Sequence, residues 1–278
     1  RLVNSNIDVF ITFHSTADVA EGGTSKSLKQ LLPELRSAAR IFVHSVSDLV
    51  NLKAFGLIAN TSLFPHGVKT DIVTSAEGSA FDQIRGKTII SSYGFLLPHK
   101  GIRNLIHAFG NVAGRHPDAH LLLVNAEYPV DVSIQETVLC RRLIQELSLS
   151  DRVTLITDFL EDTESLAWLS LSTCVVFPYE HTQESSSAAV RWGLTTGKPV
   201  YCTPLPIFDD VRDVVEFLPS TDVKGIEDGL CAMLSDHQAS REQLSGRQQE
   251  WLKDHDWRHL SNRLKNLLQS HAMNKRGI

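Results

Sequence analysis

Cysteines, long apolar runs and excess positive charge are all scarce in this sequence, and each shortage excludes a class of protein. The four cysteines lie roughly thirty residues apart without a C-x-x-C pair, which argues against a zinc site or a disulfide framework and predicts free, buried thiols. No apolar run approaches the ~20 residues that span a bilayer, and no signal peptide opens the chain. A net charge of -5, from 27 Lys and Arg against 32 Asp and Glu, argues against a partner that is a nucleic acid. The twelve histidines include no H-x-x-x-H pair within a helical segment, so neither a metal site nor another cofactor is expected.

What the sequence does contain is an alternation of apolar runs of strand length with segments of helical period. Its 278 residues, 42% hydrophobic and 21% charged, are typical of a globular protein of one large or two ordinary domains. The apolar runs show no polar alternation, which predicts strands buried on both faces, in parallel sheets covered by helices. The predicted strands are residues 7–13, 41–44, 61–65, 88–93, 121–125, 153–157, 175–177 and 200–203. The predicted helices are residues 27–40, 47–55, 102–115, 133–147, 163–170, 186–195 and 257–271.

A polar stretch without periodicity, residues 69–87, interrupts this alternation. The part before it has three predicted strands, where a complete Rossmann-like half usually has five or six. We therefore expect an α/β protein with two Rossmann-like domains, of which the first is truncated. The expected parts are a partial N-terminal domain over 1–70, a linker over 71–87, a C-terminal domain over 88–256 and a closing helix over 257–278.

The most informative stretch follows the apolar strand at residues 174–178. There Glu184 and the hydroxyls of Ser185, Ser186 and Ser187 stand where a strand is expected to give way to a helix. The free N–H groups and the dipole of a helix start favour an anion, and strand ends of parallel sheets are where ligands bind. A sugar phosphate suits this chemistry. The alternative is local stabilisation: a first-turn carboxylate contributes ~0.3–1 kcal/mol, and serines cap helices.

Six segments resemble retaining glycosyltransferases of the GT-B fold, family 4. Residues 94–109 resemble the motif G-R-L-x-x-x-K-G-x-x-x-L-I-x-A-F, and residues 177–200 resemble the block P-S-x-x-E-G-F-G-x-x-x-x-E-A-x-A-x-G-x-P-V. Shorter likenesses cover residues 12–14, 43–45, 64–68 and 257–267. Together they extend over nearly the whole chain.

The resemblance implies a GT-B-like fold, with the two domains facing each other across a cleft, and an activity. The chain would transfer a sugar, with retention and without a metal, from a nucleotide-diphosphate sugar to a glycan or lipid-linked acceptor. A likeness to bacterial surface-polysaccharide enzymes favours GDP-mannose, hence a mannosyltransferase of polysaccharide biosynthesis. It would be cytoplasmic, with at most peripheral contact at the inner face of the membrane, where the tail carrying Lys275 and Arg276 could touch anionic lipid weakly.

The resemblance also assigns residues. His14, at a strand end, would line the sugar, and Glu184 would accept hydrogen bonds from donor hydroxyls; both are candidate catalytic residues. Lys100, which is expected to open a helix, would hold the donor diphosphate together with the three serines. Further donor contacts would come from Gly94, His181 and Trp192. Each has a simpler alternative, such as a solvated lysine or a tryptophan that fills space between helix and sheet, and His66 is expected to be structural.

Two positions depart from the family pattern. Trp192 stands where the family has a second glutamate, which holds the donor ribose, and Phe95 stands where it usually has a basic residue that holds the diphosphate. Donor binding must therefore be rearranged or weakened. A non-catalytic or partner-dependent binding module stays open as the alternative. A sugar-nucleotide epimerase or a phosphorylase is a third reading, although no pyridoxal-binding lysine motif supports the latter.

Overall fold

The computed structural model describes residues 7–21, 24–72, 76–182, 184–235 and 238–276. Its contacts divide the chain into two compact units. The first unit comprises Arg1–His66 with the later segments Thr182–Ser187 and Pro206–Asp210, and the second comprises the rest. Each unit is described by itself below.

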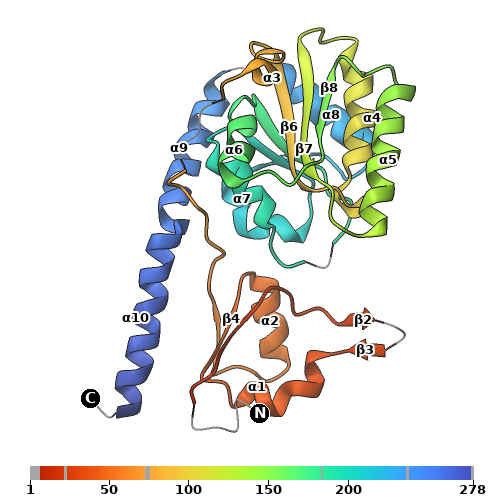
Figure 1. The fold of residues 1–278 in the computed structure, drawn as a ribbon. Coiled ribbons are helices and arrows are strands. Elements are labelled where there is room, and N and C mark those ends of the chain that lie inside the picture. The colour runs from red at the N-terminus through yellow and green to blue at the C-terminus, as the bar shows by residue number, and fades with distance from the viewer. Residues whose placement is uncertain (1–6, 22–23, 73–75, 183, 236–237, 277–278) are drawn as a thin grey trace. The chain divides into compact units, whose positions relative to one another are not determined.

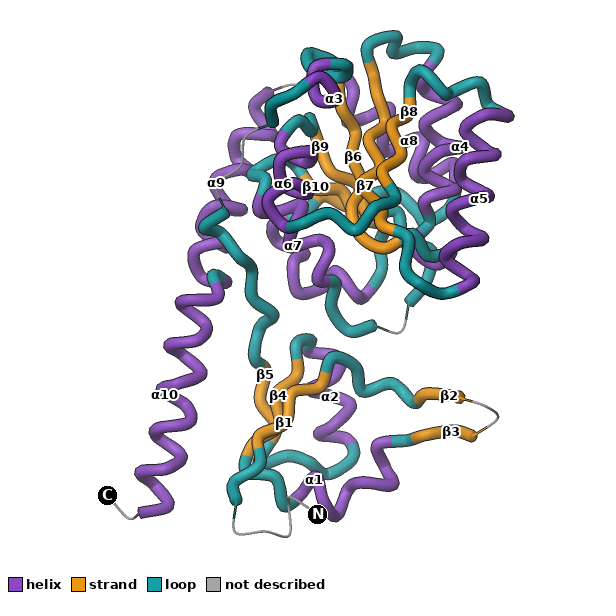
Figure 2. Tube along the Cα trace, in the orientation of Figure 1, coloured by secondary structure: helices purple, strands orange, loops and turns teal. Residues whose placement is uncertain are grey.

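The first unit is built on a parallel sheet of three strands in the order β1-β4-β5 (Figures 1 and 2). Leu35, Ile41, Val43, Leu52 and Leu57 form its core against the helices. The three predicted strands are confirmed. The elements are β1 (Phe10–Phe13), β2 (Val19–Glu21), β3 (Thr24–Lys26), the 3-10 helix η2 (Leu28–Leu31), α1 (Leu32–Arg36), β4 (Arg40–Val43), α2 (Val46–Ala54) and β5 (Thr61–Leu63).

Two local details of this unit differ from the prediction. No strand was predicted within residues 15–25, but β2 and β3 pair there as an antiparallel hairpin, whose strands of three residues each are too short to carry an apolar pattern. The helix predicted over residues 47–55 begins one residue earlier, because Ser45 is the N-cap of α2 and its hydroxyl accepts the N–H of Asp48 at 3.1 Å. Gly56, directly after the predicted helix, has a φ of 84°, which is the left-handed conformation that ends helices.

The second unit contains a parallel sheet of six strands in the order β11-β10-β9-β6-β7-β8. Five of these strands were predicted, and the two-residue β11 was not. The strands are β6 (Thr88–Phe95), β7 (Ala119–Ala126), β8 (Val153–Ile156), β9 (Cys174–Phe177), β10 (Val200–Cys202) and β11 (Glu216–Phe217). The helical segments are α3 (Ser79–Asp82), η3 (Pro98–Lys100), α4 (Ile102–Ala113), α5 (Asp131–Glu146), α6 (Asp162–Ser170), α7 (Ala188–Thr195), α8 (Val223–Ser235), α9 (Gln238–His255) and α10 (Trp257–Arg276). The 3-10 helix η4 (Pro206–Val214) is divided between the two units after Asp210.

Helices cover both faces of this sheet, as Figure 1 shows. On one face, α4, α5 and α8 bury residues such as Phe109, Ile144 and Leu230 against β6, β7 and β9. On the other face, Leu166 and Leu169 of α6 pack on the alternate residues of β6 and β7. The apolar runs thus lie in strands buried on both sides, as predicted.

The strand order reverses between β6 and β9. From β6 the chain adds β7 and β8 on one side, then returns past β6 and adds β9, β10 and β11 on the other. In open parallel sheets, the crevice outside the carboxyl ends of the strands at such a reversal is the usual ligand site. The carboxyl ends of β6 and β9 are therefore where a ligand of this unit is expected.

Among the described residues, no helix is long and apolar enough to cross a membrane. All four cysteines are free; Cys140, Cys174 and Cys202 are buried, and Cys231 is half-buried.

Candidate functional site

The chain leaves β6 through a glycine whose conformation other residues rarely adopt. Gly94 has a φ of 128°, and a Cβ there would lie 3.3 Å from the Cβ of Ala189, in the first turn of α7. The next buried residue, Leu96, donates its N–H to the carbonyl of Ala126 at the end of β7, at 2.8 Å. The end of β6 is thus fixed against both α7 and β7.

The loop after β6 lies directly against the chain after β9. Gly101 has a φ of 70°, and a Cβ at this position would overlap the carbonyl oxygen of Pro178. In addition, the N–H of Glu180 donates to the carbonyl of His99 at 3.0 Å. Lys100 was expected to open a helix, but it ends the 3-10 helix η3, and α4 begins at Ile102. The left-handed Gly101 separates the two helices.

This contact places the ammonium of Lys100 on an aromatic ring. Nζ lies 4.1 Å from the ring centroid of Tyr179, which is 2% exposed. Tyr179 is anchored in turn, because Thr203 at the end of β10 donates its hydroxyl to the carbonyl of Tyr179 at 2.7 Å. A cation on a ring gains ~0.5–2 kcal/mol. Lys100 is thus a half-buried cation held at the strand reversal. Tyr179 was not singled out from the sequence, although an aromatic residue soon after a buried strand was the available signal.

A second cation stands one turn further on. Arg103, in the first turn of α4, donates from Nε to Oε1 of the buried Glu136 at 2.8 Å. This hydrogen bond raises the pKa of the Arg103 guanidinium. Arg103 was not singled out from the sequence, although a basic residue at a helix start opposes the helix dipole and was a signal for it.

The side chains of α7 pack against the interior of the second unit. Trp192 lies 5.9 Å from the ring of Tyr93 and joins the apolar cluster under α6, which supports the space-filling alternative. Arg191 is 3% exposed, and its guanidinium lies 5.8 Å from the ring centroid of Trp251 in α9. His181 is exposed in the loop after β9, with its ring 6.3 Å from that of His99.

Glu184 does not begin a helix, contrary to the prediction. α7 starts at Ala188, and the exposed Glu184 lies in a turn in which its N–H donates to the hydroxyl of Thr182 at 3.0 Å. Ser186 donates its hydroxyl to the Asp210 carboxylate at 2.8 Å. Such side-chain hydrogen bonds compete with helix formation, which explains the later start. This segment groups with the first unit, whereas Gly94, Lys100, His181 and Trp192 belong to the second.

His14 directly follows β1, and two other histidines accompany it in the first unit. His44 directly follows β4, and His66 lies three residues beyond β5. The ring centroids are 4.9 Å apart for His14 and His44, 5.1 Å for His44 and His66, and 6.2 Å for His14 and His66. His44 is 6% exposed, and its Nδ1 lies 3.0 Å from the carbonyl oxygen of Phe64. That these histidines lie together was not predicted from the sequence.

A carboxylate is held at the same edge of this sheet. Asp48, in the first turn of α2, accepts hydrogen bonds from the N–H and the hydroxyl of Thr16 and, at 2.7 Å, from the hydroxyl of Ser45. Burial alone would raise the pKa of Asp48, but hydrogen bonds from Ser185, Thr16 and Ser45 outweigh it and leave the pKa below its ordinary value. Asp48 is therefore ionised at neutral pH.

No protein-family model matches the sequence, and no curated protein matches it. Solved structures do match. A sucrose-phosphate synthase from Thermosynechococcus elongatus has a TM-score of 0.76 at 19% identity, over 96% of this chain and 68% of the other. An alpha,alpha-trehalose-phosphate synthase (UDP-forming) from Burkholderia xenovorans, in complex with glucose-6-phosphate, has a TM-score of 0.72 at 11% identity, over 87% and 64%. Anabaena HepE, in complex with UDP and glucose, has a TM-score of 0.72 at 14% identity, over 95% and 72%.

The chain has a GT-B-like fold. Its parallel sheets of three and six strands correspond to the two Rossmann-like domains that were predicted. At 11% to 19% identity the likeness establishes the fold, and the chain spans 64% to 72% of the lengths of these three proteins.

The second unit carries three exposed aromatic side chains beside the strand reversal, which we call the aromatic platform. Phe95, Tyr128 and Phe159 follow or end β6, β7 and β8, with exposures of 36%, 43% and 78%. The ring of Phe95 lies 4.9 Å from Tyr128, edge to face, and 5.9 Å from Phe159, stacked. Phe95, one of the two departures from the family pattern, is thus part of a three-ring surface.

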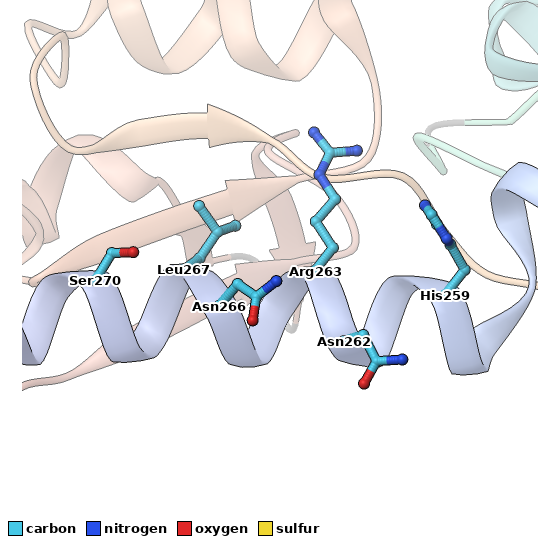
Figure 3. A pocket seen from close by; sticks show the side chains of 6 residues that line it. All are labelled: His259, Asn262, Arg263, Asn266, Leu267 and Ser270. Atoms are coloured by element: carbon cyan, nitrogen blue, oxygen red, sulfur yellow. The ribbon is translucent and has the colours of Figure 1, made fainter.

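Two other features give no site. Among the described residues, no group of three His, Cys, Asp or Glu has the geometry to hold a metal ion. Figure 3 shows a pocket whose lining comes entirely from α10 and contains none of the predicted site residues. It is lined by His259, Asn262, Arg263, Asn266, Leu267 and Ser270.

Proposed function

We propose that the chain transfers a sugar from a nucleoside-diphosphate sugar to an acceptor. The observation that carries this proposal is the half-buried Lys100 ammonium on Tyr179, at the strand reversal of a parallel sheet in a GT-B-like fold. Transfer expels a nucleoside diphosphate, so the main catalytic requirement is to stabilise negative charge that develops on phosphate. Lys100 and Arg103 would supply that charge from one loop and the helix turn after it.

The aromatic platform supports a nucleotide at the same edge. A nucleobase stacks on aromatic rings whatever its hydrogen-bonding pattern, and such stacking is worth ~1–3 kcal/mol per base. We propose that Phe95, Tyr128 and Phe159 offer the base this face, so that the departure at Phe95 exchanges a phosphate contact for a stacking contact. Gly94 would admit the donor close to the backbone, and His181 would line the same loop.

The remaining roles are proposals carried by the resemblance. Glu184 would bind donor hydroxyls, Ser185, Ser186 and Ser187 would contact the diphosphate, and His14 would line the sugar. Retention, metal independence and a glycan or lipid-linked acceptor belong to the same proposal. Trp192, which packs near Tyr93, would be a further donor contact, in the place where the family has the glutamate that holds the ribose.

A thermal-stability panel identifies the donor class. UDP, GDP and ADP, with UDP-glucose and GDP-mannose, are added to the protein; a ligand at 100 times its Kd stabilises by ~2.7 kcal/mol. One nucleotide should raise the melting temperature, and Lys100→Ala should lose that rise. Lys198→Ala is the matched control, because Lys198 precedes the amino end of β10, at the opposite edge of the sheet.

Release of the nucleoside diphosphate distinguishes an enzyme from a binding module. Release from the stabilising sugar nucleotide, in the presence of glycan or lipid-linked acceptors and absent in Lys100→Ala, supports transfer. Stabilisation without any release supports the binding-module alternative. If no nucleotide stabilises the protein, the proposal is wrong.

A further inference from the structure

The first unit gathers three imidazoles at the carboxyl edge of its parallel sheet. We call His14, His44 and His66 the histidine cluster. Each comes from the chain just after a different strand, and the three ring centroids lie within 4.9 to 6.2 Å of one another. His14 is exposed, His66 half-buried and His44 buried, so the cluster reaches from the interior to the surface.

Protonating all three imidazoles at this spacing costs free energy, because their positive charges repel one another. A free imidazole titrates near pH 6.5, and two positive charges about 5 Å apart repel each other. An anion placed among them reverses this effect, because each added proton then faces an opposite charge. Binding of an anion and uptake of protons are linked at such a site.

A carboxylate of the same unit is already bound by the residues that follow two of the histidines. Thr16, two residues after His14, and Ser45, directly after His44, both donate to Asp48 of α2. Their hydrogen bonds keep Asp48 ionised, so it contributes a fixed negative charge over the range in which imidazoles titrate. The later segments of the first unit add the carboxylates of Glu184, Asp209 and Asp210. An added anion therefore needs protonated rings, which makes its affinity depend on pH.

We propose that the histidine cluster is a proton-linked subsite for a phosphate monoester, which is the phosphate of the acceptor if the proposed transfer function holds. A terminal phosphate offers three oxygens, one for each ring. Its second pKa of about 6 overlaps the titration of imidazole, so dianion and imidazolium coexist between roughly pH 6 and 6.5. The phosphate can belong to a soluble sugar phosphate or to a lipid phosphate.

Calorimetric titration of the whole chain with glucose 6-phosphate, at pH 5.2, 6.2 and 7.5, tests the subsite. Affinity should be highest near pH 6.2 and fall on both sides. Sulfate stays a dianion throughout this range, so its affinity should rise steadily as the pH falls. Glucose, which lacks the phosphate, should not bind there.

Variants locate the subsite. His66→Asn and His14→Asn should each weaken the binding of glucose 6-phosphate by about tenfold or more at pH 6.2, because a hydrogen bond to a charged group is lost. His107→Asn, on the exposed face of α4 in the second unit, is the matched control and should bind like the original chain. Circular dichroism melting verifies that each variant is folded.

Three results would overturn the proposal: binding of neither glucose 6-phosphate nor phosphatidic acid vesicles to the original chain, an affinity independent of pH, or undiminished binding in His66→Asn. The source of the phosphate is decided by comparing glucose 6-phosphate with vesicles containing phosphatidic acid, and binding of either one through the cluster supports the subsite. The nucleotide panel is run on the same variants. If phosphate binds but no nucleotide stabilises the protein, the subsite is supported and the donor site is refuted. If a nucleotide stabilises the protein but phosphate does not bind, only the subsite is refuted.

Discussion

Gly101 gives the sharpest test of the site geometry, because the chain offers a matched control. Gly101 and Gly197 have nearly the same left-handed conformation, with φ of 70° and 67°. A Cβ at Gly101 would overlap the carbonyl oxygen of Pro178, whereas one at Gly197 would meet nothing within 4 Å. Alanine at either position incurs the same backbone strain, and the difference between the two variants isolates the contact with Pro178.

Backbone strain and overpacking determine how much free energy of unfolding each variant should lose. A left-handed alanine costs ~1–2 kcal/mol, offset by ~0.4–1 kcal/mol because alanine restricts the unfolded chain. Gly197→Ala should therefore destabilise by about 1 kcal/mol or less. Overpacking adds ~1–3 kcal/mol, so Gly101→Ala should lose about 2–4 kcal/mol.

Urea unfolding followed by circular dichroism measures both losses. The displaced loop also carries Lys100, so Gly101→Ala should weaken nucleotide binding while Gly197→Ala should not. Equal destabilisation of the two variants would refute the reasoning, because it would mean that the loops after β6 and β9 do not touch as described.

Three further predictions concern stability and reactivity. Burial lowers the pKa of His120 to about 4; because this lies below the ordinary 6.5, stability is complete above pH 6.5 and falls by roughly 2–3 kcal/mol as the pH drops towards 4. His120→Gln should flatten that pH dependence of the urea midpoint, and an unchanged slope would contradict the assignment. Burial raises the pKa of Cys140 to about 12, so iodoacetamide at pH 8 should label Cys231 first and Cys140 only after unfolding, as mass spectrometry can resolve. Ser45→Ala should lower the free energy of unfolding by ~1–2 kcal/mol through loss of the α2 cap, whereas Ser47→Ala should lower it by less than 0.5 kcal/mol. A larger loss for Ser47→Ala in thermal melting would mean that Ser47, and not Ser45, caps the helix.

Buried strands were predictable because their signal is local. β7 is buried along nearly all of its length, and its apolar run marks it whatever surrounds it. The β2–β3 hairpin has strands of only three residues each, which is too short for an apolar pattern to mark them in the sequence. The prediction of where α7 begins was wrong for a related reason, because the hydrogen bond from Ser186 to Asp210 joins residues 24 positions apart in the chain.

Likewise, only part of the candidate site could be predicted from the sequence. Gly94 and Lys100 could be selected from the motif that they share with the resembling family. Tyr179 as the partner of Lys100 could not, because their contact depends on Gly101 allowing the loops after β6 and β9 to meet. The histidine cluster likewise requires the parallel register of β1, β4 and β5, which brings together rings that lie far apart in sequence.

The insertion of β9 beside β6 has a consequence for synthesis of the protein. Ile90 pairs with Cys174, about eighty residues later, whereas β6, β7 and β8 pair in the order in which they leave the ribosome. Until β9 emerges, one edge of β6 is an unpaired apolar strand, which is the kind of edge that pairs with other chains. Closing so long a loop is also slow. The interval between translation of β8 and translation of β9 is thus when the nascent chain depends most on chaperones, and rare codons placed there should lower the soluble yield more than rare codons placed after β10.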